Sequence, residues 1–334
     1  MLRKANGLNE LLEMAPHNAT IVDSIVKAWS VVNKKENNKL MCSISGGADS
    51  DIMMDLIWRV DIQDKVDYIW FDTGIEYQAT KEHLKELEVK YNIAILKKKA
   101  KVPVPAGCNK YGLPFLSKKV ANMIQRLQSH GFQWKDEDFE TLLAKYPNCK
   151  SALQWWCNQN GKVLNIENNK YLKEFMIQNP PSFVISDKCC HYAKKIVGNS
   201  VVKDGSYQVR MEGLRKAEGG QRAIRFTSCY SANSSAGCDD YRPIFWYTNQ
   251  DKKVYEEHYG IVHSRCYTEY GLTRTGCAGC LFGRDFEYEL SVLKKYEPKL
   301  FIAATHIFSE SYEYTRKYRE FVEEKRRINQ KEKT

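Results

Sequence analysis

The stretch Lys39 to Ser50, KLMCSISGGADS, decides the expected fold. It begins as a short apolar run, which two glycines then interrupt. The following residues, 51–60, carry apolar side chains at helical spacing, namely Ile52, Met53, Leu56 and Ile57. This order predicts a strand over 39–45, then a tight turn, then a helix.

A glycine turn at a helix N-terminus can hold a phosphate group. Free backbone N–H groups and the positive end of the helix dipole collect there, and glycines let the backbone approach a phosphate closely. The residues that we expect to bind a pyrophosphate are Ser45, Gly46, Gly47, Ala48, Asp49 and Ser50. Because two glycines after a strand can also form a plain tight turn, the loop alone leaves both interpretations open.

A second strand and helix follow the first pair. Residues 66–71 (VDYIWF) form another apolar run, which ends at Asp72-Thr73-Gly74, and residues 80–91 have helical periodicity. Residues 93–96 predict a third strand, and 207–214 (YQVRMEGL) again has strand character. Strands that alternate with helices predict an α/β fold, with a twisted, mostly parallel sheet and helices on both faces.

Changes in pattern along the chain predict five segments. We expect an N-terminal helical segment, a nucleotide-binding α/β core, a helical insertion rich in aromatic residues, the remainder of the core with its arginines and cysteines, and C-terminal helices with a charged tail. In that order, the segments are residues 1–38, 39–102, 103–182, 183–284 and 285–334.

The composition is typical of a globular protein with anionic partners. Of the 334 residues, 43% are hydrophobic and 28% are charged, which excludes a disordered chain. No apolar run approaches the roughly 18 residues that a membrane span needs, so we expect a cytoplasmic protein without membrane contact. The formal net charge of +10 favours nucleotides or nucleic acid as partners, and it does not choose between them.

The eleven cysteines predict metal or redox chemistry, because a reducing compartment disfavours a disulfide framework. Two pairs carry this prediction: Cys189-Cys190, and Cys277 with Cys280 in a C-x-x-C motif. Four thiolates can close a tetrahedral zinc site or hold a 4Fe-4S cluster. Uncoordinated thiols are the third interpretation, and Cys266 is a substitute ligand.

Three motifs carry a family resemblance. The string S-G-G-x-D-S at Ser45 to Ser50 resembles the PP-loop of ATP pyrophosphatases, which cleave ATP between its α and β phosphates. Residues 71–76 with Thr80 resemble the F-x-D-T-G region of phosphoadenosine phosphosulfate reductases. Residues 213–222 resemble the G-x-R-x-x-E-S-x-x-R segment of the same enzymes, with Gly219 in place of the serine.

The resemblance implies a nucleotide site, a metal site and their ligands. The implied ligands of ATP and Mg²⁺ are the six loop residues with Asp72, Thr73, Gly74, Arg215 and Arg222, of which Ser45, Asp49, Ser50 and Arg215 are implied to be catalytic. The cysteine spacing resembles the cluster-binding pattern of the adenylylsulfate-reducing branch. It implies a 4Fe-4S cluster, with zinc as the alternative, on Cys189, Cys190, Cys277 and Cys280.

The resemblance leaves three candidate functions. Sulfonucleotide reductases use a cysteine in a C-terminal E-C-G-L-H motif, whereas no cysteine follows Cys280 here. An ATP-dependent sulfurtransferase that forms AMP and pyrophosphate is therefore favoured. It would resemble the sulfur-inserting subunit of DNA phosphorothioation systems and the cluster-containing tRNA thiolases, with DNA or tRNA as acceptor and a sulfur-donor protein such as a cysteine desulfurase. A reductase with an atypical thiol and a non-catalytic nucleotide-binding subunit are the alternatives.

Overall fold

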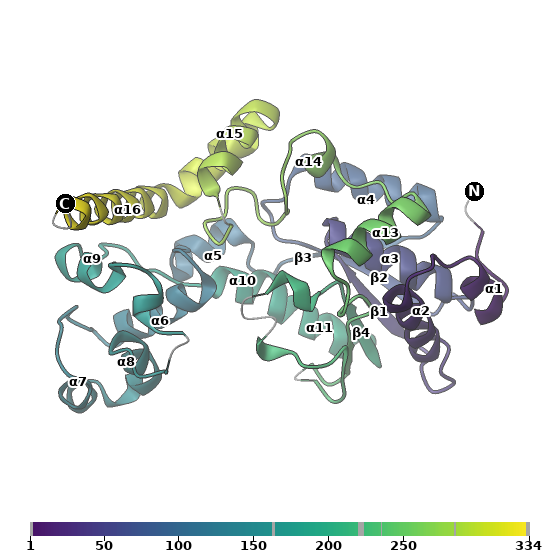
Figure 1. Ribbon diagram of the computed structural model, residues 1–334, viewed down its shortest axis with the longest axis horizontal. Helices are drawn as coiled ribbons and strands as arrows, with labels where there is room; N and C mark the ends of the chain where they lie inside the picture. The colour runs from purple at the N-terminus through teal and green to yellow at the C-terminus, as the bar shows by residue number, and fades with distance from the viewer. Residues whose placement is uncertain (1–2, 162–163, 220–223, 235, 284, 332–334) are drawn as a thin grey trace. The chain divides into compact units, whose positions relative to one another are not determined.

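The computed structural model describes residues 3–161, 164–219, 224–234, 236–283 and 285–331. The chain divides into two compact units (Figure 1). The first unit, called the sheet unit here, is made of Met1–Lys101 and Ala193–Ala278. The second, called the helical unit, is made of Val102–Tyr192 and Gly279–Thr334.

The sheet unit is built on one six-stranded sheet with the order β3-β2-β1-β4-β6-β5. Every neighbouring pair is parallel except β5 with β6, which is antiparallel. The predicted α/β fold with a mostly parallel sheet is therefore confirmed. The strands are β1 (Leu40–Ile44), β2 (Val66–Asp72), β3 (Ile95–Lys99), β4 (Val209–Glu212), β5 (Tyr230–Ser231) and β6 (Asp239–Tyr241).

Helices cover both faces of this sheet. Alternate residues of a strand point to opposite faces, and in β1 Cys42 packs with α2 and α3 while Met41 packs with α11 through Val202. The helices of this unit are α1 (Leu8–Glu13), α2 (Ala19–Val32), α3 (Ala48–Val60), α4 (Gln78–Tyr91), α11 (Ile196–Gly205), α13 (Asn249–Tyr259) and α14 (Arg265–Thr268). A short 3-10 turn spans Lys216–Glu218.

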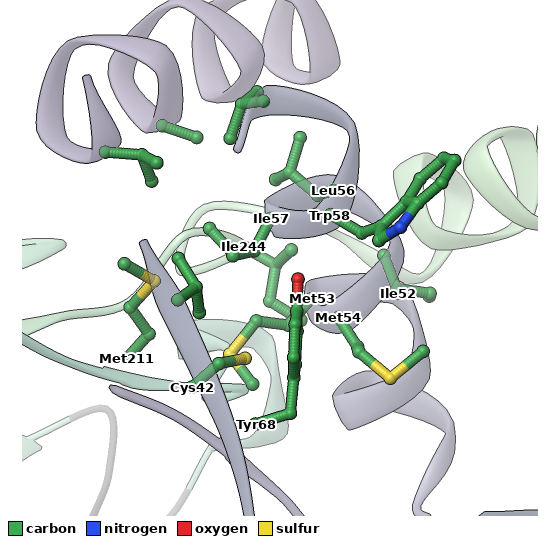
Figure 2. Close-up of a cluster of buried hydrophobic side chains, with 14 of the residues drawn as sticks. Cys42, Ile52, Met53, Met54, Leu56, Ile57, Trp58, Tyr68, Met211 and Ile244 are labelled. Atoms are coloured by element: carbon green, nitrogen blue, oxygen red, sulfur yellow. The ribbon is translucent and has the colours of Figure 1, made fainter. Parts of the chain in front are cut away.

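The core of the sheet unit centres on α3. Twelve of its thirteen residues are buried, so the helix is enclosed on all sides rather than along one stripe. Figure 2 shows Ile57 and Met53 among Cys42, Tyr68 and Met211 of the neighbouring strands. Full burial of one such side chain stabilises a fold by about 1.5–3 kcal/mol, so this cluster holds the helix firmly against the sheet.

A buried carboxylate fixes α3 to its neighbours. Asp55 is fully buried and accepts hydrogen bonds from Arg59, from Tyr91 of α4 and from Tyr255 of α13. The Arg59 guanidinium also stacks on the Tyr259 ring, 4.0 Å from its centroid. Because the buried Asp55 carboxylate is paired with the Arg59 guanidinium, the cluster positions three helices without leaving a buried charge unpaired.

Strand β3 forms one edge of the sheet. Its residues are partly or fully exposed, and Lys97, Lys98 and Lys99 stand in sequence along it. The strand begins at Ile95, two residues later than the sequence predicts. Charged side chains of this kind discourage further strands from pairing with an open edge.

The helical unit contains only helices and connecting segments among its described residues. Its α-helices are α5 (Val104–Tyr111), α6 (Lys118–Gln128), α7 (Phe139–Lys145), α8 (Lys150–Trp156), α9 (Leu172–Gln178), α10 (Lys188–Cys190), α15 (Phe286–Tyr296) and α16 (Pro298–Lys331). Two 3-10 turns span Pro147–Cys149 and Ile166–Asn168. A π-helical turn, His191–Lys195, follows α10, and its last three residues belong to the sheet unit. All of residues 103–182 fall in this unit.

An aromatic core joins the predicted insertion to the C-terminal helix within the helical unit. Trp155, Trp156 and Phe175 lie in one buried cluster with Tyr314 and Tyr318 of α16. Phe175 contacts both tyrosine rings, with centroids 5.1 and 5.3 Å apart. Because residues more than a hundred positions apart share this core, the insertion and the C-terminal segment fold together as one unit. The finer segment boundaries stay a prediction.

Candidate nucleotide site and cysteine group

The loop after β1 has a tight, internally bonded conformation. The Ser45 N–H donates to Ser50 Oγ at 2.9 Å, and the Gly47 N–H donates to Ser45 Oγ at 3.3 Å. Gly46 has φ +66°, and a Cβ at this position would lie 2.8 Å from Thr80 Cγ2. A side chain at Gly46 would therefore be both strained and too close to α4. The two serine hydroxyls shape the loop by accepting its backbone N–H groups.

We predict that Gly46→Ala lowers the free energy of unfolding by about 2–4 kcal/mol, because the left-handed conformation costs about 1–2 kcal/mol and the methyl group also meets Thr80. Gly131→Ala is the matched control, since Gly131 has φ +70° with nothing within 4 Å of its Cβ position. The control should lose only the free energy that the left-handed backbone conformation costs. Urea unfolding of both variants measures the difference, and equal losses would contradict the contact with Thr80.

The Asp49 carboxylate lies between two cations. Arg215 Nε donates to its Oδ2 and Lys252 Nζ to its Oδ1, each at 2.9 Å. Arg215 is 7% exposed and also donates to the Tyr247 carbonyl and to Asn249 Oδ1. The sequence predicts Arg215 as a phosphate ligand; the structure brings it to the loop through Asp49, and the role toward phosphate stays a prediction.

Close packing of two backbones lets Arg215 reach this position. A Cβ at Gly213 would lie 3.1 Å from both the Asp49 carbonyl oxygen and the Ser50 Cα. Glycine at the end of β4 therefore allows the strand end to approach the first turn of α3. Arg222, which the sequence also predicts as a ligand, lies outside the described residues.

A buried histidine and carboxylate chain lies next to the loop, and the sequence analysis missed it. Asp51 Oδ2 is 2.8 Å from His263 Nδ1 and 3.1 Å from His83 Nε2, and His263 Nε2 is 2.7 Å from Glu256 Oε1. Burial alone would lower the pKa of His263, but hydrogen bonds to Asp51 and Glu256 and their negative charges raise it to about 9. His263 is therefore an imidazolium at neutral pH.

We predict that His263 makes stability depend on pH in the alkaline direction. Its folded pKa of about 9 lies above the ordinary value of about 6.5, so its contribution is complete below about pH 6.5 and is lost as the pH rises through about 9. Urea unfolding of wild type and His263→Gln measures this. The two free energies should differ most near pH 6, by about 3 kcal/mol, and converge near pH 10.

The groups that face His263 set the control for this prediction. They are Asp51, Glu256 and Lys252, which lies 3.6 Å from Glu256, together with His83 on the shared carboxylate. Lys253 lies on α13, as Lys252 and Glu256 do, and forms an exposed ion pair with Glu257. The variant Lys253→Gln should therefore leave the dependence of stability on pH unchanged. A stability difference between wild type and His263→Gln that stays constant with pH would contradict the titration.

The second sequence motif lies at the end of β2. Asp72 Oδ1 accepts the Gly74 N–H at 2.9 Å, and Lys97 Nζ lies 2.7 Å from Oδ2. Partial burial opposes ionisation, but the bonds from Lys97 and Gly74 lower the pKa of this carboxyl group below its usual value. Thr73 is fully buried and donates to Glu76 Oε1 at 2.6 Å.

Cys277 is bound to this second motif. It forms an antiparallel bridge with Glu76, and the next residue, Ala278, donates its N–H to the Ile75 carbonyl at 2.9 Å. The Cys277 sulfur lies 3.4 Å from Thr73 Oγ1. A thiol of the C-x-x-C motif therefore lies beside the D-T-G segment within the sheet unit. Cys266, the substitute ligand, is buried in the same unit with its sulfur 3.7 Å from Thr80 Oγ1.

The helical unit holds a separate group of thiols centred on Cys189. The Cys189 thiol interacts with the thiols of Cys108 and Cys190 and lies within electrostatic range of Cys280. The interaction with Cys108, together with burial and the nearby Cys280, raises the pKa of Cys189, although the interaction with Cys190 opposes this shift. Helices α5 and α10 pack closely there, since a Cβ at Gly107 would lie 3.4 Å from the Cys189 Cα.

The sequence predicts three of these four cysteines and missed Cys108, which belongs to no motif. All eleven cysteines are thiols. Among the described residues, no set of three or more Cys, His, Asp or Glu side chains is arranged to hold a metal ion. Gly279, inside the C-x-x-C motif, has φ +68°, and a Cβ there would lie 2.6 Å from Tyr312 Oη. The motif therefore bends closely against α16.

Residues 39–133 match the model of the phosphoadenosine phosphosulfate reductase domain. The resemblance inferred from the sequence is thus confirmed for this segment. The matched part contains both nucleotide motifs and Cys108, and it ends before Arg215 and the predicted cysteine ligands. No curated protein matches the chain.

Several solved structures resemble the fold at low similarity. Phosphoadenylyl-sulfate reductase from Candida auris is 13% identical over 83% of this chain and 97% of its own, with a TM-score of 0.41. An FMN adenylyltransferase from Candida glabrata is 11% identical over 81% of this chain and 69% of its own, at 0.39. A U34-tRNA thiolase from Methanococcus maripaludis, solved with its 4Fe-4S cluster, is 12% identical over 91% and 80%, at 0.38.

Among the described residues, no helix combines the length and the apolarity that crossing a membrane requires.

Proposed function

We propose that this chain is an ATP-dependent enzyme that forms AMP and pyrophosphate, adenylylates its substrate and transfers sulfur to it. One observation carries the proposal. The S-G-G-x-D-S loop, the D-T-G segment and the thiol of Cys277 all belong to the sheet unit, at the carboxyl ends of the adjacent parallel strands β1 and β2. Open α/β sheets bind their ligands at this edge.

The first step would join AMP to the substrate. ATP would lie with its phosphates on the N–H groups of the loop and of the first turn of α3. A substrate oxygen attacks the α-phosphorus, the bond to the bridging oxygen breaks, and pyrophosphate leaves with the electron pair. Arg215 and Lys252, which now hold Asp49, supply positive charge beside the leaving group.

The donor groups fit a magnesium nucleotide better than a protein-held ion. Mg²⁺ prefers oxygen ligands, keeps several waters and is commonly bound through one or two carboxylates with the phosphates of the substrate. Asp49 and Asp72 are the carboxylates at this edge, and each already bonds a cation. Mg²⁺ would offset the phosphate charge. Asp49 could bind the Mg²⁺ ion once Arg215 or Lys252 left its carboxylate and bound the nucleotide instead.

The second step would replace AMP by sulfur. A hydrosulfide sulfur attacks the carbon that bears the adenylylated oxygen, the C–S bond forms, the C–O bond breaks, and AMP leaves with the electron pair. On a DNA phosphate the same exchange would occur at phosphorus, with a P–S bond formed and a P–O bond broken. Cys277 and Thr73 would line the side from which sulfur approaches. The formal net charge of +10 is consistent with a nucleic acid as acceptor, DNA or tRNA.

The thiols of the helical unit fit an iron–sulfur cluster better than one zinc ion. Zinc bonds its four sulfurs at about 2.3 Å, so they must converge on one point, whereas a 4Fe-4S cube spreads its ligands over four irons. The described side chains do not converge on one point, although the Cys189 thiol interacts with three other thiols, those of Cys108, Cys190 and Cys280. Such a cluster would supply an iron site that carries the sulfur or holds the segment after Cys280.

Incubation of ATP, labelled at the α-phosphate, with the protein, sulfide and total tRNA or duplex DNA tests this function. We expect AMP and pyrophosphate in equal amounts. Ser50→Ala should weaken ATP binding roughly tenfold, because the Ser50 hydroxyl accepts the Ser45 N–H that shapes the loop. Ser200→Ala, which removes a hydroxyl bonded to Asp204 on α11, is the matched control and should bind ATP normally.

The products decide between the candidate functions. Release of ADP and phosphate would contradict the proposed chemistry. Binding of ATP without turnover would favour a non-catalytic nucleotide-binding subunit.

The thiol of Cys277 beside Thr73 supports a second candidate, a sulfonucleotide reductase. There, the thiolate attacks the sulfonucleotide sulfur, the S–O bond breaks and AMP leaves, and a second thiol then displaces sulfite. Sulfite release from adenylylsulfate, lost in Cys277→Ser, would establish that reaction.

We predict that Cys108 is a ligand of the cluster. Anaerobically purified wild type should contain about four irons and show a visible charge-transfer band, and Cys108→Ser should lose most of both. Cys149→Ser is the matched control, because Cys149 is a buried thiol of the same unit whose sulfur lies 3.4 Å from the Arg126 carbonyl oxygen. Retention of iron by Cys108→Ser would exclude this ligand, and a colourless zinc protein would exclude the cluster.

A further inference from the structure

A short segment of the sheet unit lies across the phosphate loop. We call residues 264–275 the strap. His263, just before the strap, is bonded to Asp51 and Glu256, and Arg265 inside it pairs with Glu82. Cys277, just after it, is bonded to the D-T-G segment. Both ends of the strap are therefore fixed to the elements that flank the nucleotide site.

Two hydroxyl groups of the strap lie directly over the loop. Tyr267 Oη accepts the backbone N–H of Ala48 at 3.1 Å, and Thr275 Oγ1 lies 3.1 Å from the same hydroxyl. A Cβ at Gly47 would meet Thr275 Oγ1 at 3.3 Å and Tyr267 Oη at 3.4 Å. The two hydroxyl groups therefore lie in van der Waals contact with the loop at Gly47, where no side chain covers the backbone.

The Ala48 N–H is one of the groups that a bound phosphate would need. It belongs to the first residue of α3, a helix of thirteen residues, where N–H groups lack intrahelical acceptors and the dipole favours negative charge. A tyrosine hydroxyl satisfies the hydrogen bond but brings no negative charge. Burial keeps it neutral, because burial raises the pKa of Tyr267 above its usual value.

We propose that Tyr267 is an affinity-determining residue of the nucleotide site, whose hydroxyl stands in for a phosphate oxygen on the Ala48 N–H and must be displaced when a phosphate binds. The proposal rests on the proposed binding of ATP at this loop. One N–H has one good acceptor position, so the hydroxyl oxygen and a phosphate oxygen compete for it. Displacement would carry Thr275 with Tyr267, because the two hydroxyls are bonded to each other.

The variant Tyr267→Phe tests the competition directly. It removes the competing hydroxyl oxygen but keeps the aromatic ring and its packing, so the Ala48 N–H becomes available to a phosphate oxygen. We expect pyrophosphate and ATP to bind roughly three- to tenfold tighter, which is the usual worth of one neutral hydrogen bond. Isothermal titration of each probe measures the change. Tyr207→Phe is the matched control, because it removes a hydroxyl bonded to Asp67 at the other end of the sheet, and its affinity should equal that of wild type.

Hydrogen exchange in the wild type gives a second measurement that needs no variant. Amide exchange in a peptide covering residues 264–275 should become faster when pyrophosphate is added, because the hydroxyl pair leaves the loop. Slower exchange would instead mean that the strap closes on the ligand. That result, or an unchanged or weaker affinity of Tyr267→Phe, would overturn the proposal.

The outcomes separate this proposal from the proposed function. If the wild type binds ATP and Tyr267→Phe binds it no tighter, competition is excluded while the nucleotide site stands. If neither protein binds ATP or pyrophosphate, and Tyr207→Phe does not either, both proposals are wrong. Thermal unfolding of each variant checks that the fold is intact. The variant Thr275→Val tests the competition for the Ala48 N–H independently. That variant removes the bond that holds the Tyr267 hydroxyl in place, so it should also tighten binding.

Discussion

The first turn of α3 carries two carboxylates, and the pairing of their charges organises the whole candidate site. Asp49 is held by cations from the end of β4 and from α13, and Asp51 by two histidines. Acidic groups suit a helix N-terminus, but two of them beside a phosphate loop would repel the ligand. Their partners cancel that repulsion. The same contacts draw the strand end, α13 and the strap to one edge of the sheet.

Much of the fold could be predicted from the sequence, because it depends on local patterns. The runs at 39–45 and 66–71 became neighbouring parallel strands, and the glycine motifs after them lie at the carboxyl ends of those strands. The strand ends were less certain, since β4 spans only Val209–Glu212 where 207–214 had strand character. Apolar periodicity identifies an element more reliably than it fixes its limits.

The contacts between residues of the site could not be predicted, because the paired residues are distant in the chain. Arg215 lies 166 positions from Asp49, and His263 lies 212 positions from Asp51. Cys108 belongs to no motif and meets Cys189 only because α5 packs on α10. Spacing rules detect ligands that are close in sequence. A residue whose role depends on the packing of two helices leaves no local signal.

The lysine-bearing edge of the sheet has a consequence for assembly. Among the described strands β3 has one neighbour, β2, and Lys97, Lys98 and Lys99 follow one another along it. If the β3 strands of two molecules paired edge to edge, their lysine side chains would lie close together, and the like charges would repel one another. Self-association by strand addition is thus disfavoured at β3.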